Sequence, residues 1–170
     1  YLSIEVVSLM SFILAGYLKD NPRSNEASLK YVIYGAFSSG IMLYGLSIIF
    51  GLTGTTNYFE IRDAVKALDG SADLALTIAS VFVLAGFGYK ISAVPFHFWT
   101  PDVYEGSPTP ITAYLSVAPK AAGFALMIRF FNQVFVDGAS LSGMGWSSTV
   151  SFSWPQLLGI ISVITMSMGN

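Results

Sequence analysis

Long apolar runs separated by short polar segments form the dominant pattern of this chain. An α-helix needs about 20 apolar residues to cross the roughly 30 Å of hydrocarbon in a bilayer, and several of the runs approach or exceed that length. The pattern therefore predicts an all-α membrane protein with about five transmembrane helices. We expect these helices at residues 1–18, 29–53, 74–99, 111–134 and 155–170, the third of them broken near Pro95.

The connections between the runs carry the turn-forming residues. Residues 19–28 and 100–110 are predicted to be turns, and the Ser/Gly-rich residues 136–154 a loop. Pro155 can then open a helix, because the first turn of a helix has no hydrogen bond to lose there. In the remaining connection, the piece YFEIRDAVKAL has apolar residues at helical spacing and predicts a short amphipathic helix at the membrane surface.

Composition supports a membrane protein and limits its chemistry. Hydrophobic residues make up 54% of the chain and charged residues 11%, whereas soluble domains carry about 25% charged residues. The net charge of −2 offers no basic field for nucleic acid. Without cysteine, a thiolate zinc site or an ordinary iron–sulfur cluster is excluded, and we expect no cofactor in this chain. Because it starts and stops inside apolar runs, we expect an internal piece of a longer protein.

Ionisable side chains inside the apolar runs are the candidate functional residues, because a charge near the bilayer centre costs about 3 kcal/mol or more. Glu5, Lys30, Lys90 and Lys120 meet this description. Glu5 lies about 20 Å along its helix from the following turn, which is past the midplane. Lys30 is near the start of its helix, so by position it is either an interfacial lysine with its ammonium in water or a buried partner of Glu5.

Lys90 and Lys120 are expected at matching depths. Each stands roughly 15 Å along its helix from the turn at residues 100–110, so a helical hairpin around this turn would bring the two ammonium groups to similar height. Neighbouring buried lysines cannot both stay charged without cost, because desolvation and like charge both favour the neutral form. The two residues therefore suit a site that exchanges protons. The alternative is that each pairs permanently with a carboxylate and only holds helices together.

Two prolines and a histidine add to this site. Pro95 and Pro119 are each predicted to free the carbonyl four residues earlier, and at membrane depth such a carbonyl needs water or a polar partner. His97 has an ordinary pKa near 6.5, which suits a proton relay; a surface histidine bonded to the turn is the alternative. Asp102 and Glu105, in the acidic turn that follows, are expected to be solvated or to cap the next helix.

Residues 90–129, KISAVPFHFWTPDVYEGSPTPITAYLSVAPKAAGFALMIR, closely resemble the core of the N subunit of bacterial respiratory complex I and of the corresponding B subunit in the cyanobacterial and plastid complex. The opening YLSIEVVSLMSFILAGYLKDNPRSNEASLKY is similar to the fifth helix and following loop of the same antiporter-like family. The resemblance implies helices five to nine of a longer subunit. One departure is Pro119, where the family usually has a small residue such as serine.

This resemblance implies a proton-translocating subunit in which Glu5, Lys90 and Lys120 form a relay and Lys30 opens the sixth helix. It implies no electron transfer in this chain. NAD(P)H or ferredoxin, FMN, iron–sulfur clusters and quinone would belong to the whole complex, and other membrane-arm subunits would be the partners. The implied location is a bacterial inner membrane, or a thylakoid membrane for a cyanobacterial or plastid source. The alternatives are an Mrp-type or stand-alone cation/proton antiporter subunit, and a structural membrane spacer.

Overall fold

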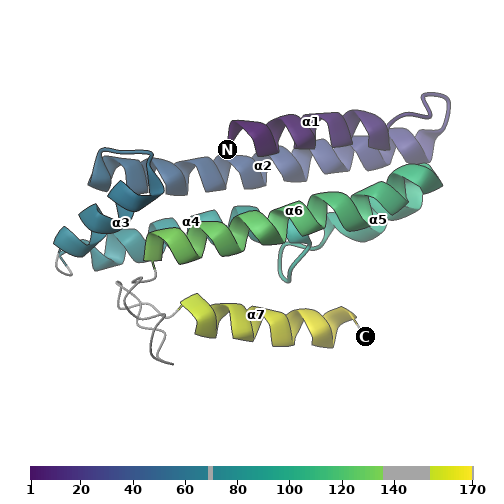
Figure 1. The fold of residues 1–170 in the computed structure, drawn as a ribbon. Coiled ribbons are helices and arrows are strands. Elements are labelled where there is room, and N and C mark those ends of the chain that lie inside the picture. The colour runs from purple at the N-terminus through teal and green to yellow at the C-terminus, as the bar shows by residue number, and fades with distance from the viewer. Residues whose placement is uncertain (69–70, 136–153, 170) are drawn as a thin grey trace.

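The computed structural model describes residues 1–68, 71–135 and 154–169, and every regular element within these residues is a helix. The predicted all-α class is therefore confirmed. The helices, shown in Figure 1, are α1 (Leu2–Ala15), α2 (Pro22–Thr53), α3 (Tyr58–Ala67), α4 (Asp73–Ile91), α5 (Trp99–Gly106), α6 (Thr109–Phe135) and α7 (Trp154–Gly169).

The central helix of the arrangement is α2. It packs against α1, α3, α4 and α5, while α6 packs against α4, α3 and α1. Figure 1 shows α3 at one end of the molecule, and α5 and the α1–α2 connection at the other. The helices thus run roughly parallel or antiparallel to one axis, as expected for a bundle in a membrane.

Within the described residues, three helices, α2, α4 and α6, are long and apolar enough to cross a membrane. Two of the five predicted spans, α1 and α7, are apolar but shorter. Large apolar side chains also lie on the outside of the bundle: Leu2 is 80% exposed, Phe37 71% and Val117 67%. Such a surface suits contact with lipid or with further helices rather than with water.

The contact between α2 and α4 depends on small residues. A Cβ atom at Gly45 of α2 would lie 2.7 Å from the carbonyl oxygen of Ala79, and one at Gly86 of α4 would collide with Met42. The missing side chains therefore allow the two helix backbones to approach closely. At Gly40, on the same helix as Gly45, an added Cβ would have no neighbouring atom within 4 Å, so this glycine serves no such contact.

Two predicted connections are partly wrong, because they form helix. The segment 19–28 is a turn only as far as Asn21, whose side-chain oxygen accepts a hydrogen bond from the Arg23 N–H at 3.0 Å. Asn21 is thus the N-cap and Pro22 the first residue of α2, a strong start signal. The predicted turn at 100–110 holds the eight-residue helix α5.

The break near Pro95 is confirmed, but its predicted cause is wrong. α4 ends at Ile91, and Ser92 follows with a left-handed backbone at φ 59°. Pro95 therefore lies beyond the helix, after a cis Val94–Pro95 bond, and removes no hydrogen bond from α4. The chain then enters α5 at Trp99.

The remaining connections agree with the sequence where they are described. The predicted amphipathic piece forms α3, with Ile61 and Val65 buried against the bundle. α7 begins at Trp154, directly before the predicted helix-opening Pro155. The predicted loop before it, residues 136–153, lies outside the described residues.

Candidate functional site

The candidate site is built around the C-terminal end of α4. The Ser92 N–H donates to the Tyr89 carbonyl at 3.1 Å, and the Ala93 N–H donates to the Gly88 carbonyl at 2.8 Å. This pair of bonds around a left-handed residue is a Schellman motif, which ends a helix inside the protein with its last carbonyls satisfied. Lys90 stands in this last turn, where the partial negative charge of the helix terminus favours a cation.

Aromatic side chains fix the position of this helix end. The Trp99 indole N–H donates to the Tyr89 carbonyl at 3.1 Å, and the Tyr89 hydroxyl donates to the Tyr31 carbonyl at 3.1 Å. The rings of Tyr31 and Trp99 stack with their centroids 4.6 Å apart. The end of α4 is therefore bonded both to α2 and to the start of α5.

The non-helical segment after α4 is also tied to its neighbours. The Thr100 hydroxyl donates to the Ser92 oxygen at 2.8 Å, and the Val94 N–H donates to the Thr165 oxygen of α7 at 3.1 Å. Backbone groups that lose helical partners at membrane depth must be satisfied by other polar atoms. These two contacts stabilise the segment that connects Lys90 to His97.

Lys90 and Glu5 form an ion pair inside the bundle. The Lys90 Nζ atom lies 3.5 Å from Glu5 Oε1, and the two side chains are only 10% and 21% exposed. Lys90 also donates to the Ser8 oxygen, and the Ser39 hydroxyl donates to Glu5 Oε1 at 2.8 Å. Residues from α1, α2 and α4 thus meet at one buried charged site.

A cavity of about 160 Å³ lies beside Lys90 and reaches α6. Its lining includes Lys90, Ser8 and Tyr31 on one side, and Pro119 and Ala122 of α6 on the other. The α4 and α6 backbones are close here, because a Cβ atom at Gly123 would lie 3.5 Å from the Lys90 Cβ. The cavity between Lys90 and this turn of α6 is lined mainly by apolar side chains, together with a few serine hydroxyls.

Lys120 occupies that turn of α6. Its Nζ atom lies 5.1 Å from the centroid of the Tyr104 ring, a cation–π contact. Pro119 stands inside a continuous α6 and leaves the Leu115 carbonyl without its helical partner. That carbonyl accepts a hydrogen bond from the Tyr104 hydroxyl at 3.4 Å. The polar partner that the sequence predicted for the freed carbonyl is thus Tyr104 of α5. Tyr104 contacts both Leu115 and Lys120, a connection that the sequence did not reveal.

Lys30 pairs elsewhere. Its Nζ atom lies 2.7 Å from Glu26 and 2.7 Å from Asp102, and its side chain is 37% exposed. It is therefore a partly exposed lysine held by two carboxylates, and not a partner of Glu5. Asp102, expected to be solvated or a cap, is 50% exposed and also forms an ion pair from α5 to Lys30 of α2. The sequence does contain a signal for the Lys30–Glu26 pair, because the two residues are one helical turn apart.

Glu105 and His97 are the remaining ionisable side chains that the sequence named near α5. Glu105 lies 3.8 Å from Arg23, with both side chains well exposed. His97 is stacked on Phe98 with ring centroids 4.8 Å apart, and its buried Nδ1 atom has no hydrogen-bond partner among the described residues. His97 thus lies on the broken segment beyond Lys90, and its ring contact is with its own neighbour in the chain.

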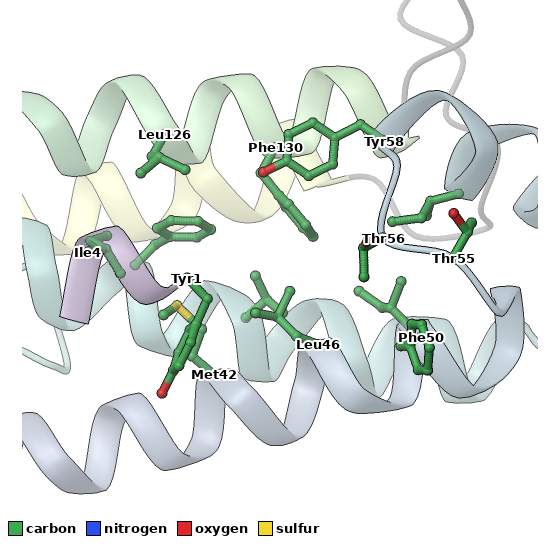
Figure 2. Close-up of a pocket in the computed structure, with 14 residues that line it drawn as sticks. Tyr1, Ile4, Met42, Leu46, Phe50, Thr55, Thr56, Tyr58, Leu126 and Phe130 are labelled. Atoms are coloured by element: carbon green, nitrogen blue, oxygen red, sulfur yellow. The ribbon is translucent and has the colours of Figure 1, made fainter. Parts of the chain in front are cut away.

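A separate cavity of about 270 Å³ lies between α1, α2, α3, α4 and α6. Figure 2 shows Leu126 and Phe130 above it and Met42, Leu46 and Phe50 below, with no lysine, aspartate or glutamate among the described residues of its lining. Charges are disfavoured in such surroundings. We therefore assign the charged site, not this cavity, as the candidate functional site.

The fold and the site define a class: an all-helical protein with several candidate membrane spans and a buried lysine–glutamate pair beside a broken helix. The chain belongs to the family "NADH:quinone oxidoreductase/Mrp antiporter, TM", whose family model matches residues 1–170. It is 55% identical over 170 residues to NADH-quinone oxidoreductase subunit N 2 of Chloroherpeton thalassium, and these residues cover 100% of the chain and 32% of that relative. The chain thus spans about a third of the length of this relative.

Two solved structures are similar as well. A chain of respiratory complex I from Thermus thermophilus with bound aureothin matches with a TM-score of 0.64 and 35% identity, over 75% of this chain and 27% of that one. A chain of the Mrp complex from Dietzia sp. DQ12-45-1b matches with a TM-score of 0.62 and 27% identity, over 77% of this chain and 24% of that one. The suspected family is therefore confirmed.

Proposed function

We propose that this chain is part of a proton-translocating, antiporter-like membrane-arm subunit of a complex I type NAD(P)H or ferredoxin:quinone oxidoreductase. The observation that carries the proposal is the buried Lys90–Glu5 pair at the end of α4. Buried ionisable residues in membrane helices are expensive and mark ion or proton pathways. The name of the 55% identical relative supports the same complex.

In the proposed mechanism, the charge state of Lys90 is coupled to its neighbours. A proton arriving on Lys90 alters its pairing with Glu5 and, through like charge, disfavours a proton on Lys120 of the adjacent helix. The cavity that includes Lys90 and Pro119 supports this route. Lys30 and His97 would extend the relay toward the α5 end of the bundle.

We propose that the energy comes from electron transfer elsewhere in the complex. NAD(P)H or ferredoxin, FMN, iron–sulfur clusters and quinone would be bound by other subunits, and this chain would be a non-redox part of the translocase. Other membrane-arm subunits would cover part of the exposed apolar surface. The proposed location is a bacterial inner membrane, or a thylakoid membrane for a cyanobacterial or plastid source.

Lys90→Met in the full-length subunit tests the proposal. The change keeps much of the side-chain volume and removes the charge, so we expect proton pumping by the complex in proteoliposomes to fall at least tenfold. Pumping is measured from the quenching of a ΔpH-sensitive dye, with donor-driven quinone reduction measured alongside. Lys19→Met makes the same chemical change at an exposed connection and should leave pumping unchanged. Normal pumping by an assembled Lys90→Met complex would contradict the proposal.

A cation/proton antiporter subunit is the second candidate, because the chain is also similar to part of the Mrp complex. Co-purification distinguishes the two. The proposed function predicts quinone-reductase subunits in a pull-down with the full-length protein. Sodium-driven proton movement without those subunits would favour the antiporter.

A structural membrane spacer is the third candidate function. Its buried charges would only hold helices together, so Lys90→Met would lower stability and pumping in proportion. A stable, fully assembled complex that no longer pumps excludes it.

A further inference from the structure

We propose that Ser8 and Ser39 are positioning residues for the Lys90–Glu5 pair. Ser8 provides an acceptor for the Lys90 ammonium, and Ser39 provides a donor for the Glu5 carboxylate. Together they hold the two charges apart and set how readily Lys90 releases its proton. The inference rests on the proposed function, since it assigns a role within that site.

Ser8 is oriented by its own helix. Its hydroxyl donates to the Ile4 carbonyl at 2.8 Å, so the hydroxyl proton is already engaged and the oxygen lone pairs remain for Lys90. Ser8 follows Glu5 by three residues, which places both on one face of α1. A single helix face therefore presents the carboxylate and the neutral acceptor to the same ammonium group.

Ser39 acts on the other partner from α2. Its side chain is 6% exposed, and its hydroxyl donates to Glu5 Oε1, the same oxygen that faces Lys90. A hydrogen bond to a carboxylate stabilises the ionised form. Glu5 is therefore supported by a donor that does not depend on the protonation of Lys90.

The distance between Lys90 and Glu5 agrees with separate serine partners for the two charged groups. Direct ammonium–carboxylate hydrogen bonds are usually about 2.7–2.9 Å long, whereas Lys90 Nζ lies 3.5 Å from Glu5 Oε1. Each of the two groups also has a hydrogen bond to a serine. The pair is thus loosened, and the loss of the Lys90 proton does not leave Glu5 without a hydrogen-bond donor.

Among the described residues, Ser8 and Ser39 are the hydroxyl side chains that form hydrogen bonds with the pair. The titratable groups facing Lys90 are Glu5 of α1, Tyr31 of α2, which lines the same cavity, and Tyr89 of α4, whose ring centroid lies 5.7 Å from the ammonium. Tyr1 interacts with Glu5 as well, and its hydroxyl donates to the Ser39 carbonyl at 3.4 Å. α6 contributes Pro119 and Ala122 to that cavity. Across the part of the chain that the structure describes, the cavity lining includes no charged side chain of α6.

The chain offers a matched control for each serine. Ser80 of α4 is 2% exposed and donates to the Leu76 carbonyl at 2.7 Å, a contact within its own helix. Ser38, next to Ser39, is 7% exposed, and its hydroxyl has no hydrogen-bond partner among the described residues. Each control repeats the chemical change in a similarly buried position.

The first experiment compares Ser8→Ala with Ser80→Ala in the full-length subunit within the complex. Loss of the acceptor should make Lys90 release its proton more easily, so the alkaline limb of the pumping pH profile should move about one unit to lower pH. Ser80→Ala should keep the original profile, and Ser8→Thr, which retains a hydroxyl, should show little of the shift. Equal profiles for Ser8→Ala and Ser80→Ala would overturn the role of Ser8.

The second experiment compares Ser39→Ala with Ser38→Ala. Without the Ser39 donor, Glu5 attracts the Lys90 proton more strongly, so the same limb should move to higher pH, opposite to Ser8→Ala. A shift in the same direction for both serines, or none for Ser39→Ala, would overturn the inference. These failures remain distinct from failure of the proposed function, because they can occur while Lys90→Met still abolishes pumping.

Discussion

At the scale of single residues, Pro119 has a defined consequence. It removes the N–H that would bond the Leu115 carbonyl inside α6, and the Tyr104 hydroxyl lies 3.4 Å from that carbonyl. The same Tyr104 ring faces the Lys120 ammonium. Pro119 thus leaves a carbonyl that needs a hydrogen-bond donor. The donor, the Tyr104 hydroxyl, belongs to a side chain that also contacts Lys120, a proposed relay residue.

A double-mutant cycle tests this connection. Tyr104→Phe should lower the free energy of unfolding by about 1 kcal/mol, because the Leu115 carbonyl loses its donor. In a Pro119→Ala background, the backbone N–H that the substitution introduces can bond that carbonyl, so the same change should cost less. The measurement is thermal unfolding of the purified full-length subunit in detergent, with Tyr114→Phe as an exposed control. Equal costs of Tyr104→Phe in both backgrounds would show that the carbonyl is not involved.

At the scale of helices, close approach decides which elements can share a site. Lys90 reaches α1 and α2 because α4 packs directly on α2, and this contact requires glycines such as Gly45 and Gly86. Interfaces in membrane bundles depend on packing, because lipid is as apolar as the side chains themselves. The position of α4, and with it that of Lys90, therefore depends on residues far from any charge.

Gly45→Ala is expected to destabilise the α2–α4 contact. The added Cβ would lie 2.7 Å from the Ala79 carbonyl oxygen, so one helix must move, at a cost of about 1–3 kcal/mol. Gly40→Ala is the matched control on the same helix, where a Cβ meets open space; it should be neutral or slightly stabilising because alanine favours helix. Thermal unfolding of the full-length subunit in detergent compares the two. Equal melting temperatures would refute the packing argument.

At the scale of the whole molecule, the described ion pairs divide into two groups. Those near α5, Lys30–Asp102 and Arg23–Glu105, are exposed, and Arg62–Asp63 lies in α3 at the opposite end. Among the pairs named here, Lys90–Glu5 is the one in which both side chains are largely buried. This distribution fits a bundle whose ends meet water and whose middle meets lipid.

Phe37→Lys tests that arrangement. Phe37 stands near the middle of α2 and is 71% exposed, so a lysine there would face hydrocarbon at a cost of about 3 kcal/mol. We expect a clear loss of full-length subunit from the membrane fraction, measured by immunoblot after membrane isolation. Tyr17→Lys, 69% exposed in the α1–α2 connection, should insert normally. Normal insertion of both variants would show that the face of α2 around Phe37 does not meet lipid.

The sequence alone predicted the all-α membrane class, a break near Pro95 and the short amphipathic helix, because apolar run length, turn-forming residues and helical spacing are local properties. It did not place the helix end at Ile91 and Ser92, before the proline. It also selected Glu5 and Lys90, which do meet. It did not predict α5 or the early start of α2, since the turn-forming residues there are equally suited to helix starts.

Only the tertiary structure decided which groups pair. Residue counting gives depth along a helix but not the direction in which a side chain points around the bundle. For that reason Lys30 could not be separated from the partners of Glu5, and the sequence did not connect Asp102, Tyr104, Ser8 or Ser39 to the residues that they contact. Their contacts arise where helices distant in sequence pack together, and that packing depends on the whole set of small and apolar residues at once.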